Sequence, residues 1–420
     1  MNLVSLLVER FRLSVFDRSY LLLIGATFLV LFPLLFNDFA QRSGDDNWML
    51  YENTFIRSLQ WDNVTYYFTH FYTGQYSPVN TLYYSLIYQL FRLEPFWYHF
   101  FSLVLHLLNA MLVYVFIRRL LGVQVAVLPL KLAEDKVRLI AFATALLFAV
   151  HPMQVESVAW ISASKNLLYT FFSLLVLLQY MRYASTHSWW AYSLVLVFYL
   201  LAFGSKEQAA ILPANLLLVD WYTGRNMRKR SYWLSVLPFF VFAAGMGIIS
   251  LQAQDAGFAT RLANEYYPLW QRLVLACYAF TEYIYKGLLP IKLNYMYSFP
   301  MKPGEAMPLV FWFYPVVVLC FGLLLAYAWR RGWRSLFFGL GFLTINLALA
   351  LHIVPLARGV LVADRYFYMG SIGLFFIVCR YLLGQDKYSF SRIRLDPRLL
   401  IGIYVLYLGV FAWRYAVHWT

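Results

Sequence analysis

The chain has 420 residues, of which 62% are hydrophobic, 20% aromatic and only 13% charged. Soluble domains carry about 25% charged residues, so this composition excludes an ordinary soluble domain. The formal net charge of +14 does not indicate a nucleic-acid partner, because Lys and Arg cluster in short segments between apolar runs, as in cytoplasmic loops that face anionic lipid. The cysteines lie inside apolar runs and offer neither a disulfide framework nor a metal-binding spacing. The expected partner is therefore the lipid bilayer.

Apolar runs of about 20 residues, the length that spans a bilayer core, recur along the chain. Residues 1–420 are therefore predicted to form one all-α polytopic transmembrane bundle. The first helix is expected at residues 19–36, after a basic segment without a small-residue cleavage site, which favours a retained helix over a signal peptide. Further helices are expected, in chain order, at residues 95–117, 139–150, 166–180, 189–203, 208–222 and 233–251.

Two long segments are predicted to lie on the outer side of the membrane. Residues 38–79 form the first outer loop, whose charges are mostly acidic, and residues 253–308 form the second. Within the second, residues 269–289 are expected to lie in the interface or to re-enter. A crossing there would place the basic segments 330–334 and 380–398 outside, against the positive-inside tendency. This topology has about eleven crossings, with the N-terminus inside and the C-terminus outside.

Carboxylates, histidines and isolated cations collect on the outer side in this topology, beside short helices. They indicate either a site that opens to the outer leaflet or an ordinary outer surface. The acidic pair Asp45–Asp46 comes soon after the first helix. A carboxylate can take a proton from an incoming hydroxyl, and a like-charged neighbour raises the pKa of one member of a pair. The alternative is that both are helix caps or solvated loop charges.

His151 and Glu156 flank a break that Pro152 introduces into an apolar run. Together with an aspartate they could hold a divalent metal, although the spacing matches no known metal motif. The alternative is a structural ion pair between Glu156 and Lys165. No metal ligand and no cofactor is therefore assigned, and a divalent metal is kept as an alternative.

Two further polar groups interrupt or begin apolar runs. Lys206 and Glu207 join two apolar helices, and they either place a cation against a bound anion or form a salt bridge in a short loop. Arg365 and Tyr366 begin a late helix. Arginine binds phosphate through two parallel hydrogen bonds and stacks on aromatic rings, but it also anchors helices at the headgroup layer.

Several segments in chain order carry a family resemblance. They read DDNWMLYEN, YSPVNTLYYSLIYQLFRLEPFWYHFFSLVLHLLNAMLVYVFIRRL, HPMQVESVAWISASKNLLYTFFSLLVLLQYMRY, FGSKEQAAILPANLLLVDWY and ADRYFYMGSIGLFF. Together they resemble the membrane half of the transmembrane and tetratricopeptide-repeat protein O-mannosyltransferases and their bacterial relatives, a branch of the GT-C glycosyltransferases. The resemblance extends from the first helix to the region of Leu383.

The resemblance implies a GT-C fold and a glycosyltransferase that uses a polyprenyl-phosphate sugar donor. It implies that one carboxylate of Asp45 and Asp46 is the catalytic base, with Asp45 slightly favoured by analogy with the acidic pair of related mannosyltransferases. The donor phosphate is expected to bind Arg365 and Tyr366, with Lys206 as a second cation. The other family elements map onto further candidates for the substrate site, namely His151, Glu156, Lys165 and Glu207.

Two departures from the family pattern bear on the acceptor and on the site. Asn166 stands where relatives often carry an acid next to the lysine. The sequence also ends at Thr420, soon after the last expected helix, so no repeat domain is expected and the acceptor is a protein or, alternatively, a glycan or lipid. In-line displacement would invert the sugar.

Two other functions stay open, namely a transporter or flippase for a polyprenyl-linked glycan and an inactive scaffold subunit. Internal repeats and charges on both gates would favour a transporter, and the sequence shows no repeat. The expected location is a bacterial inner membrane with the active site facing the periplasm, or the endoplasmic reticulum in a eukaryote.

Overall fold

The computed structural model describes residues 18–39, 45–127, 132–256, 267–294, 297–301, 305–353, 360–384, 388–390 and 393–419. These residues are almost entirely helical, which confirms the all-α prediction. Within them, the short strands β1 (Tyr388–Phe390) and β2 (Ile393–Leu395) form an antiparallel pair. The basic N-terminal segment, on which the expectation of a retained first helix partly rests, lies outside the described residues.

Seven helical segments among the described residues are long and apolar enough to cross a membrane. They comprise α2 (Arg18–Leu31) with η1 (Phe32–Phe36), α5 (Pro95–Val127), η5 (Ile161–Ala163) with α8 (Ser164–Thr186), α11 (Arg230–Ala256), η7 (Leu309–Trp312) with α14 (Phe313–Arg330), η9 (Asp364–Tyr366) with α16 (Phe367–Leu383), and α17 (Pro397–Val417). The chain is thus an integral, multi-pass membrane protein.

An eighth span is possible if a bent pair is counted as one crossing. This pair is α6 (Glu134–Val150) followed by η4 (Pro152–Gln154) and α7 (Val155–Ala159), with a bend of 56°. The shorter helices are α9 (Trp189–Ser205), η6 (Glu207–Ile211) with α10 (Leu212–Thr223), and α15 (Arg334–Leu347) with η8 (Ala348–Ala350). Crossings by α9, α10 and α15 would bring the number to the predicted eleven, which stays a prediction.

Several predicted helix boundaries are wrong. The helix expected to end at residue 117 continues in α5 to Val127, because the four residues from Arg118 to Leu121 are good helix formers and no proline intervenes. Arg118 is accordingly buried on the helix, 3.7 Å from Glu134. That glutamate begins α6 five residues before the predicted start, and acidic residues in the first turn favour a helix there.

The segment predicted as the first outer loop contains several short helices. It contains η2 (Asn47–Tyr51), η3 (Thr54–Arg57) and α3 (Trp61–Thr69), and α4 (Pro78–Phe91) follows directly. Pro78 occupies the first turn of α4, where its missing N–H costs no hydrogen bond. In the second loop, α13 (Leu269–Leu288) is not among the helices apolar enough to span. Its placement in the interface stays a prediction.

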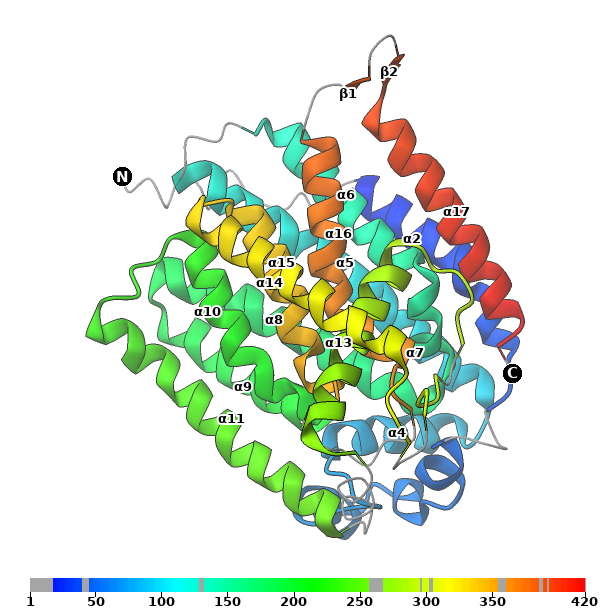
Figure 1. The fold of residues 1–420 in the computed structure, drawn as a ribbon. Coiled ribbons are helices and arrows are strands. Elements are labelled where there is room, and N and C mark those ends of the chain that lie inside the picture. Colours follow the sequence, from blue (N-terminus) through cyan, green and yellow to red (C-terminus); the bar gives the residue numbers. More distant parts are fainter. Residues whose placement is uncertain are drawn as a thin grey trace.

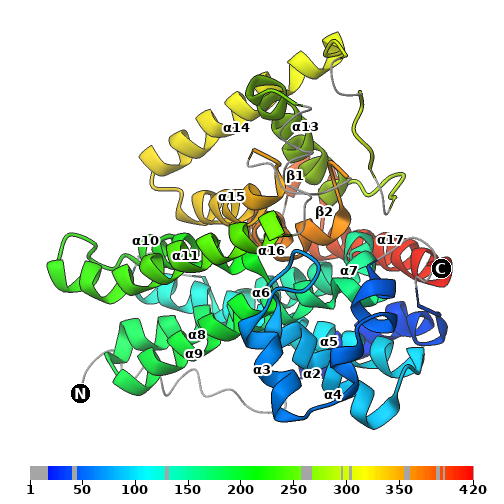
Figure 2. The same cartoon turned by 90° about the horizontal axis from the view of Figure 1, so that it is seen from below.

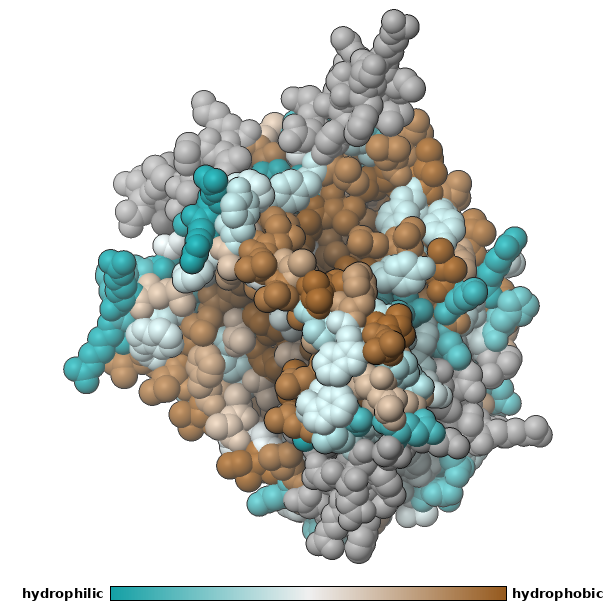
Figure 3. Space-filling model, in the orientation of Figure 1, coloured by the Kyte–Doolittle hydropathy of each residue, from teal (hydrophilic) through white to brown (hydrophobic). Residues whose placement is uncertain are grey.

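The bundle has buried central helices and apolar helices at its periphery. Figure 1 shows α6 and α16 between α11 on one flank and α17 on the other, and Figure 2 shows α13 and α14 together on one side. The apolar stretches of α11 and α14 are only 17% and 6% buried, whereas those of α8 and α16 are 78% and 72% buried. Apolar side chains cover much of the face in Figure 3. Such exposed apolar surface is expected to face lipid hydrocarbon.

A close contact between α15 and α16 holds the helix that carries one side of the candidate site. A Cβ atom on Gly373 would collide with the carbonyl oxygen of Gly339 on the facing helix. Small residues at such positions let two membrane helices approach closely. The position of α16, and of η9 at its start, therefore depends on glycine at this crossing.

Candidate functional site

The candidate site is built on the break after α6. Pro152 has no backbone N–H and ends the α6 hydrogen-bond pattern. The backbone N–H of Met153 donates instead to Nδ1 of His151, at 3.2 Å. The chain then runs through η4, α7 and η5 before α8 begins. This irregular path places several site side chains within one short segment, namely those of Glu156, Trp160, Ser162 and Lys165.

Glu156 fixes Arg365 at the start of the late helix. The Glu156 carboxylate is fully buried. Its Oε2 accepts a hydrogen bond from the backbone N–H of Arg365 at 2.7 Å, and its Oε1 accepts one from Nη1 of the guanidinium. The guanidinium carbon lies 4.6 Å from the ring centroid of Trp160 and 4.9 Å from that of Tyr366. Arg365 is therefore held in place by two hydrogen bonds to Glu156 and by contacts of its guanidinium with two aromatic rings.

Lys206 approaches the same aromatic ring from another element. It follows the end of α9 in an extended conformation, and its side chain is buried. Its Nζ lies 4.9 Å from the ring centroid of Tyr366 and donates a hydrogen bond to Oδ1 of Asn166. Two cations, Arg365 and Lys206, thus contact one ring. Because Asn166 has no charge, it does not itself neutralise the lysine.

The acidic pair of the first outer loop meets the same segment. Asp46 is fully buried, and its Oδ1 accepts hydrogen bonds from the backbone N–H of Ser162, at 2.8 Å, and from the Ser162 hydroxyl. Asp45 is partly exposed, and its Oδ1 accepts a hydrogen bond of 3.3 Å from Nε1 of Trp48. The Asp45 carboxylate also interacts electrostatically with Arg365. Carboxylates from the first loop and a cation from a late helix thus lie in one cluster.

The other residues predicted for the substrate site are Lys165, Glu207 and His151, and each makes a different contact. Lys165 donates a hydrogen bond to Oε1 of Gln75 at 3.0 Å, so the ion pair with Glu156 that the sequence offered as an alternative is replaced by this contact. Glu207 is half buried at the start of η6. His151 packs in the core, with its ring 5.1 Å from that of Phe375. The structure therefore gives His151 a helix-capping contact at the break, and its place in a substrate site stays a prediction.

Within the described residues, no group of three or more His, Cys, Asp or Glu side chains could hold a metal ion. The alternative ligand set of His151, Glu156 and an aspartate is thus not assembled there. Metal dependence of a reaction stays open to assay.

Three side chains in the cluster were not predicted from the sequence. Ser162 donates both hydrogen bonds to Asp46, and Trp160 stacks on Arg365. Asp364 is fully buried next to Arg365. Burial, with a smaller contribution from the Asp364 carboxylate, raises the pKa of the Tyr297 hydroxyl. Nothing in the sequence around Ser162 distinguishes it from its neighbour Ser164, because its partner is more than a hundred residues away.

Comparison with known proteins gives one distant similarity to report. No protein-family profile matches the chain. A protein O-mannosyl-transferase of Caenorhabditis elegans is 26% identical over 226 residues, which cover 53% of this chain and 30% of that protein. The chain thus spans less than a third of the length of the curated relative it matches. Fold and composition define a multi-pass membrane protein, and its similarity is to a glycosyltransferase.

Proposed function

We propose that the chain is a membrane glycosyltransferase of the GT-C type. It moves a sugar from a polyprenyl-phosphate donor to a hydroxyl acceptor at the outer face and inverts the anomeric centre. The observation that carries this proposal is the meeting of Asp45 and Asp46 with Arg365 and Lys206 around the segment at 156–166. The similarity to a protein O-mannosyl-transferase supports the class of reaction.

The donor phosphate binds between Arg365 and Lys206. Both cations contact the Tyr366 ring, so a phosphate bound beside that ring is attracted by two positive charges. Glu156 engages Nη1 of the guanidinium, and the guanidinium has further N–H donors that can form hydrogen bonds with phosphate oxygens. The leaving group departs as a phosphate anion, so cations placed in advance stabilise the charge that develops in the transition state.

Asp45 is the catalytic base, and Asp46 positions it. Hydrogen bonds hold a carboxylate in place and occupy its lone pairs. Asp46 accepts two such bonds from Ser162 and is fully buried, so it serves to hold the loop. Asp45 is partly exposed and accepts one long bond from Trp48. It therefore keeps lone pairs that can accept the proton of an acceptor hydroxyl.

The reaction is an in-line displacement. The acceptor oxygen attacks the anomeric carbon from the face opposite the phosphate, while the bond between that carbon and the phosphate oxygen breaks. The acceptor proton passes to Asp45 and then to water. The products are the inverted glycoside and polyprenyl phosphate. Polyprenyl tails stay in the bilayer, which agrees with the apolar periphery of the bundle.

Transfer of a radiolabelled sugar by the protein in lipid nanodiscs tests the base. Asp45→Asn keeps the size of the side chain but cannot take the proton, so turnover is expected to fall about 10²–10⁴-fold while donor binding is retained. Asp62→Asn is the matched control, because Asp62 is an exposed carboxylate on α3 of the same loop. Full turnover by Asp45→Asn would refute the assignment of the base.

A further inference from the structure

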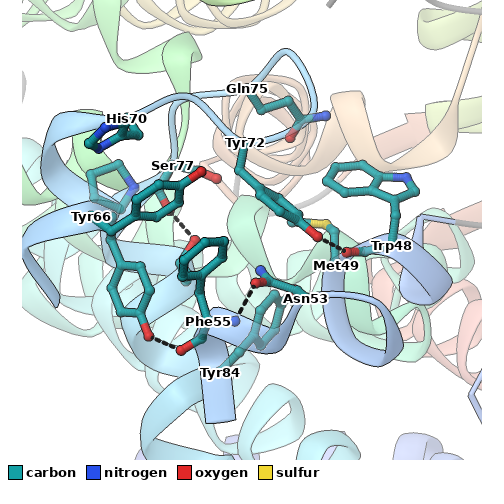
Figure 4. Close-up of a pocket in the computed structure, with 13 residues that line it drawn as sticks. Trp48, Met49, Asn53, Phe55, Tyr66, His70, Tyr72, Gln75, Ser77 and Tyr84 are labelled. Carbon is teal, nitrogen blue, oxygen red and sulfur yellow. Dashed lines mark hydrogen bonds between the residues drawn. The ribbon is translucent and has the colours of Figure 1, made fainter. Parts of the chain in front are cut away.

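The acidic and the cationic side of the candidate cluster are held in place by different contacts. The acidic pair belongs to the first outer loop, which has internal contacts of its own. Phe55 stacks on Tyr66 there with ring centroids 3.9 Å apart, and the Tyr72 hydroxyl donates a hydrogen bond of 3.1 Å to the carbonyl oxygen of Trp48 (Figure 4). Arg365, on the cationic side, receives contacts from side chains of the segment after α6.

Glu156 and Trp160 reach Arg365 from one turn of helix. The backbone N–H of Trp160 donates a hydrogen bond of 3.1 Å to the carbonyl oxygen of Glu156, where α7 ends. Side chains four residues apart on a helix lie on the same face. The Glu156 carboxylate accepts a hydrogen bond from Nη1 of Arg365, and the guanidinium carbon lies 4.6 Å from the centroid of the Trp160 ring. Both contacts therefore act on the same guanidinium.

The carboxylate and the ring restrict this guanidinium in different ways. A hydrogen bond to Nη1 fixes one nitrogen, but the planar group can still turn about that bond. A guanidinium over an aromatic face is attracted by the negative charge of that face, and tryptophan attracts cations most strongly among the aromatic residues. The Arg365 side chain is 13% exposed, so little water competes with this attraction. The Trp160 ring therefore limits the orientation of the guanidinium.

The backbone that carries the Trp160 ring is held on both sides. Its N–H is bonded to Glu156, and its carbonyl oxygen accepts a hydrogen bond of 2.9 Å from the backbone N–H of Ala163 at the end of η5. Within this turn, Ser162 donates both of its hydrogen bonds to Asp46. A ring on such an ordered backbone can hold a cation with little further loss of entropy.

We propose that Trp160 is a positioning residue of the donor site, whose ring holds the Arg365 guanidinium in the orientation that binds the donor phosphate. This inference rests on the proposed function, which puts the phosphate at Arg365. Glu156 engages Nη1, so the other N–H groups of the guanidinium are the ones left for phosphate oxygens. The affinity for phosphate should therefore follow the strength of the attraction between the ring and the cation.

Binding of farnesyl phosphate, a short polyprenyl phosphate, to the whole protein in detergent tests the inference by isothermal titration calorimetry. Farnesol, which has the same chain without the phosphate, is the reference ligand. Site-specific replacement of Trp160 by fluorinated tryptophans keeps the shape of the ring and withdraws electron density from its face. Each added fluorine is expected to weaken binding of farnesyl phosphate, and Trp160→Leu is expected to weaken it about ten-fold, whereas farnesol binding stays unchanged.

Two further variants serve as controls. Trp160→Phe keeps an aromatic face that attracts cations less strongly, so its affinity should lie between those of the unaltered protein and Trp160→Leu. Trp61→Leu removes a tryptophan of the first outer loop that is 78% exposed, and it is expected to leave binding unchanged. Unfolding temperatures show whether each variant is folded, and the fluorinated proteins provide the test if Trp160→Leu does not fold.

The outcomes separate the inference from the proposed function. Equal affinities of the unaltered and the fluorinated proteins for farnesyl phosphate would overturn the inference and leave the proposed function in place. Tighter binding after fluorination would do the same, because it indicates direct contact between the anion and the ring. Farnesyl phosphate that binds no better than farnesol would refute the phosphate site and the inference with it. Binding that follows the fluorine series, in a protein that transfers no sugar from any polyprenyl-phosphate donor, would refute the proposed function alone.

Discussion

The pairing of Glu156 with Arg365 can be tested by a double-mutant cycle. The variants are Glu156→Gln, Arg365→Met and the two together. Glu156→Gln leaves Arg365 without the carboxylate that accepts hydrogen bonds from its Nη1 and from its backbone N–H. Arg365→Met leaves a fully buried carboxylate without its cation. In the double variant neither charge is present, so neither is left unpaired.

The expected loss of folding stability in each variant follows from the burial of the Glu156–Arg365 pair. The side chains of Glu156 and Arg365 are 0% and 13% exposed. Removal of one partner from a buried ion pair costs about 3–5 kcal/mol, because the other charge stays out of water. Each single variant should therefore shift the folding equilibrium by roughly a hundred-fold or more. The double variant should be more stable than the less stable single variant, because it leaves no uncompensated buried charge, which is the reason that the single losses are large.

The assay is thermal unfolding of the purified proteins in one detergent, followed by circular dichroism. The expected order of stability is the unaltered protein, then the double variant, then at least one of the single variants. Arg138→Gln is the control, because its pair with Glu134 is about half exposed, at 46% and 53%, and exposed pairs contribute only about 0–1 kcal/mol. Strict additivity of the two single losses would show that Glu156 and Arg365 do not interact.

Three further variants test other parts of the structure. Lys206→Met is expected to weaken binding of polyprenyl phosphate about ten-fold or more, as measured by competition in nanodiscs, since a charged hydrogen bond contributes about 1.5–3 kcal/mol; unchanged affinity would remove Lys206 from the phosphate site. Ser162→Ala is expected to lower kcat more than it changes KM, because one hydrogen bond that positions the acidic loop is lost. An unchanged kcat for Ser162→Ala would contradict that role. Gly373→Val is expected to abolish folding through its collision at α15, whereas Gly402→Val, with open space around it, should fold; size-exclusion profiles distinguish the two.

The helical class could be predicted from the sequence, and so could several residues that the structure gathers in the candidate cluster. Long apolar runs identify membrane helices without knowledge of tertiary contacts, and Pro152 marks the break on which the site is built. The order of short motifs pointed to Arg365 and Lys206, which the structure brings into contact with the same ring, that of Tyr366. These features depend on local sequence or on a pattern along the chain.

The roles of individual site residues and some helix ends could not be predicted, because they depend on contacts between distant segments. The distinction between Asp45 and Asp46 arises from Ser162, more than a hundred residues away. His151 has the residue type of a catalytic group, yet its ring fills a core position beside Phe375. The extension of α5 to Val127 was missed because paired arginines are typical of a helix end at a membrane surface, whereas here the helix continues past them.

A cryo-electron microscopy structure with a polyprenyl-phosphate sugar bound tests the central claim most directly. The proposal predicts that the phosphate lies within hydrogen-bond reach of Arg365 or Lys206, with Asp45 on the opposite side of the anomeric carbon. A phosphate bound at the other membrane face, or out of reach of both cations, would contradict it.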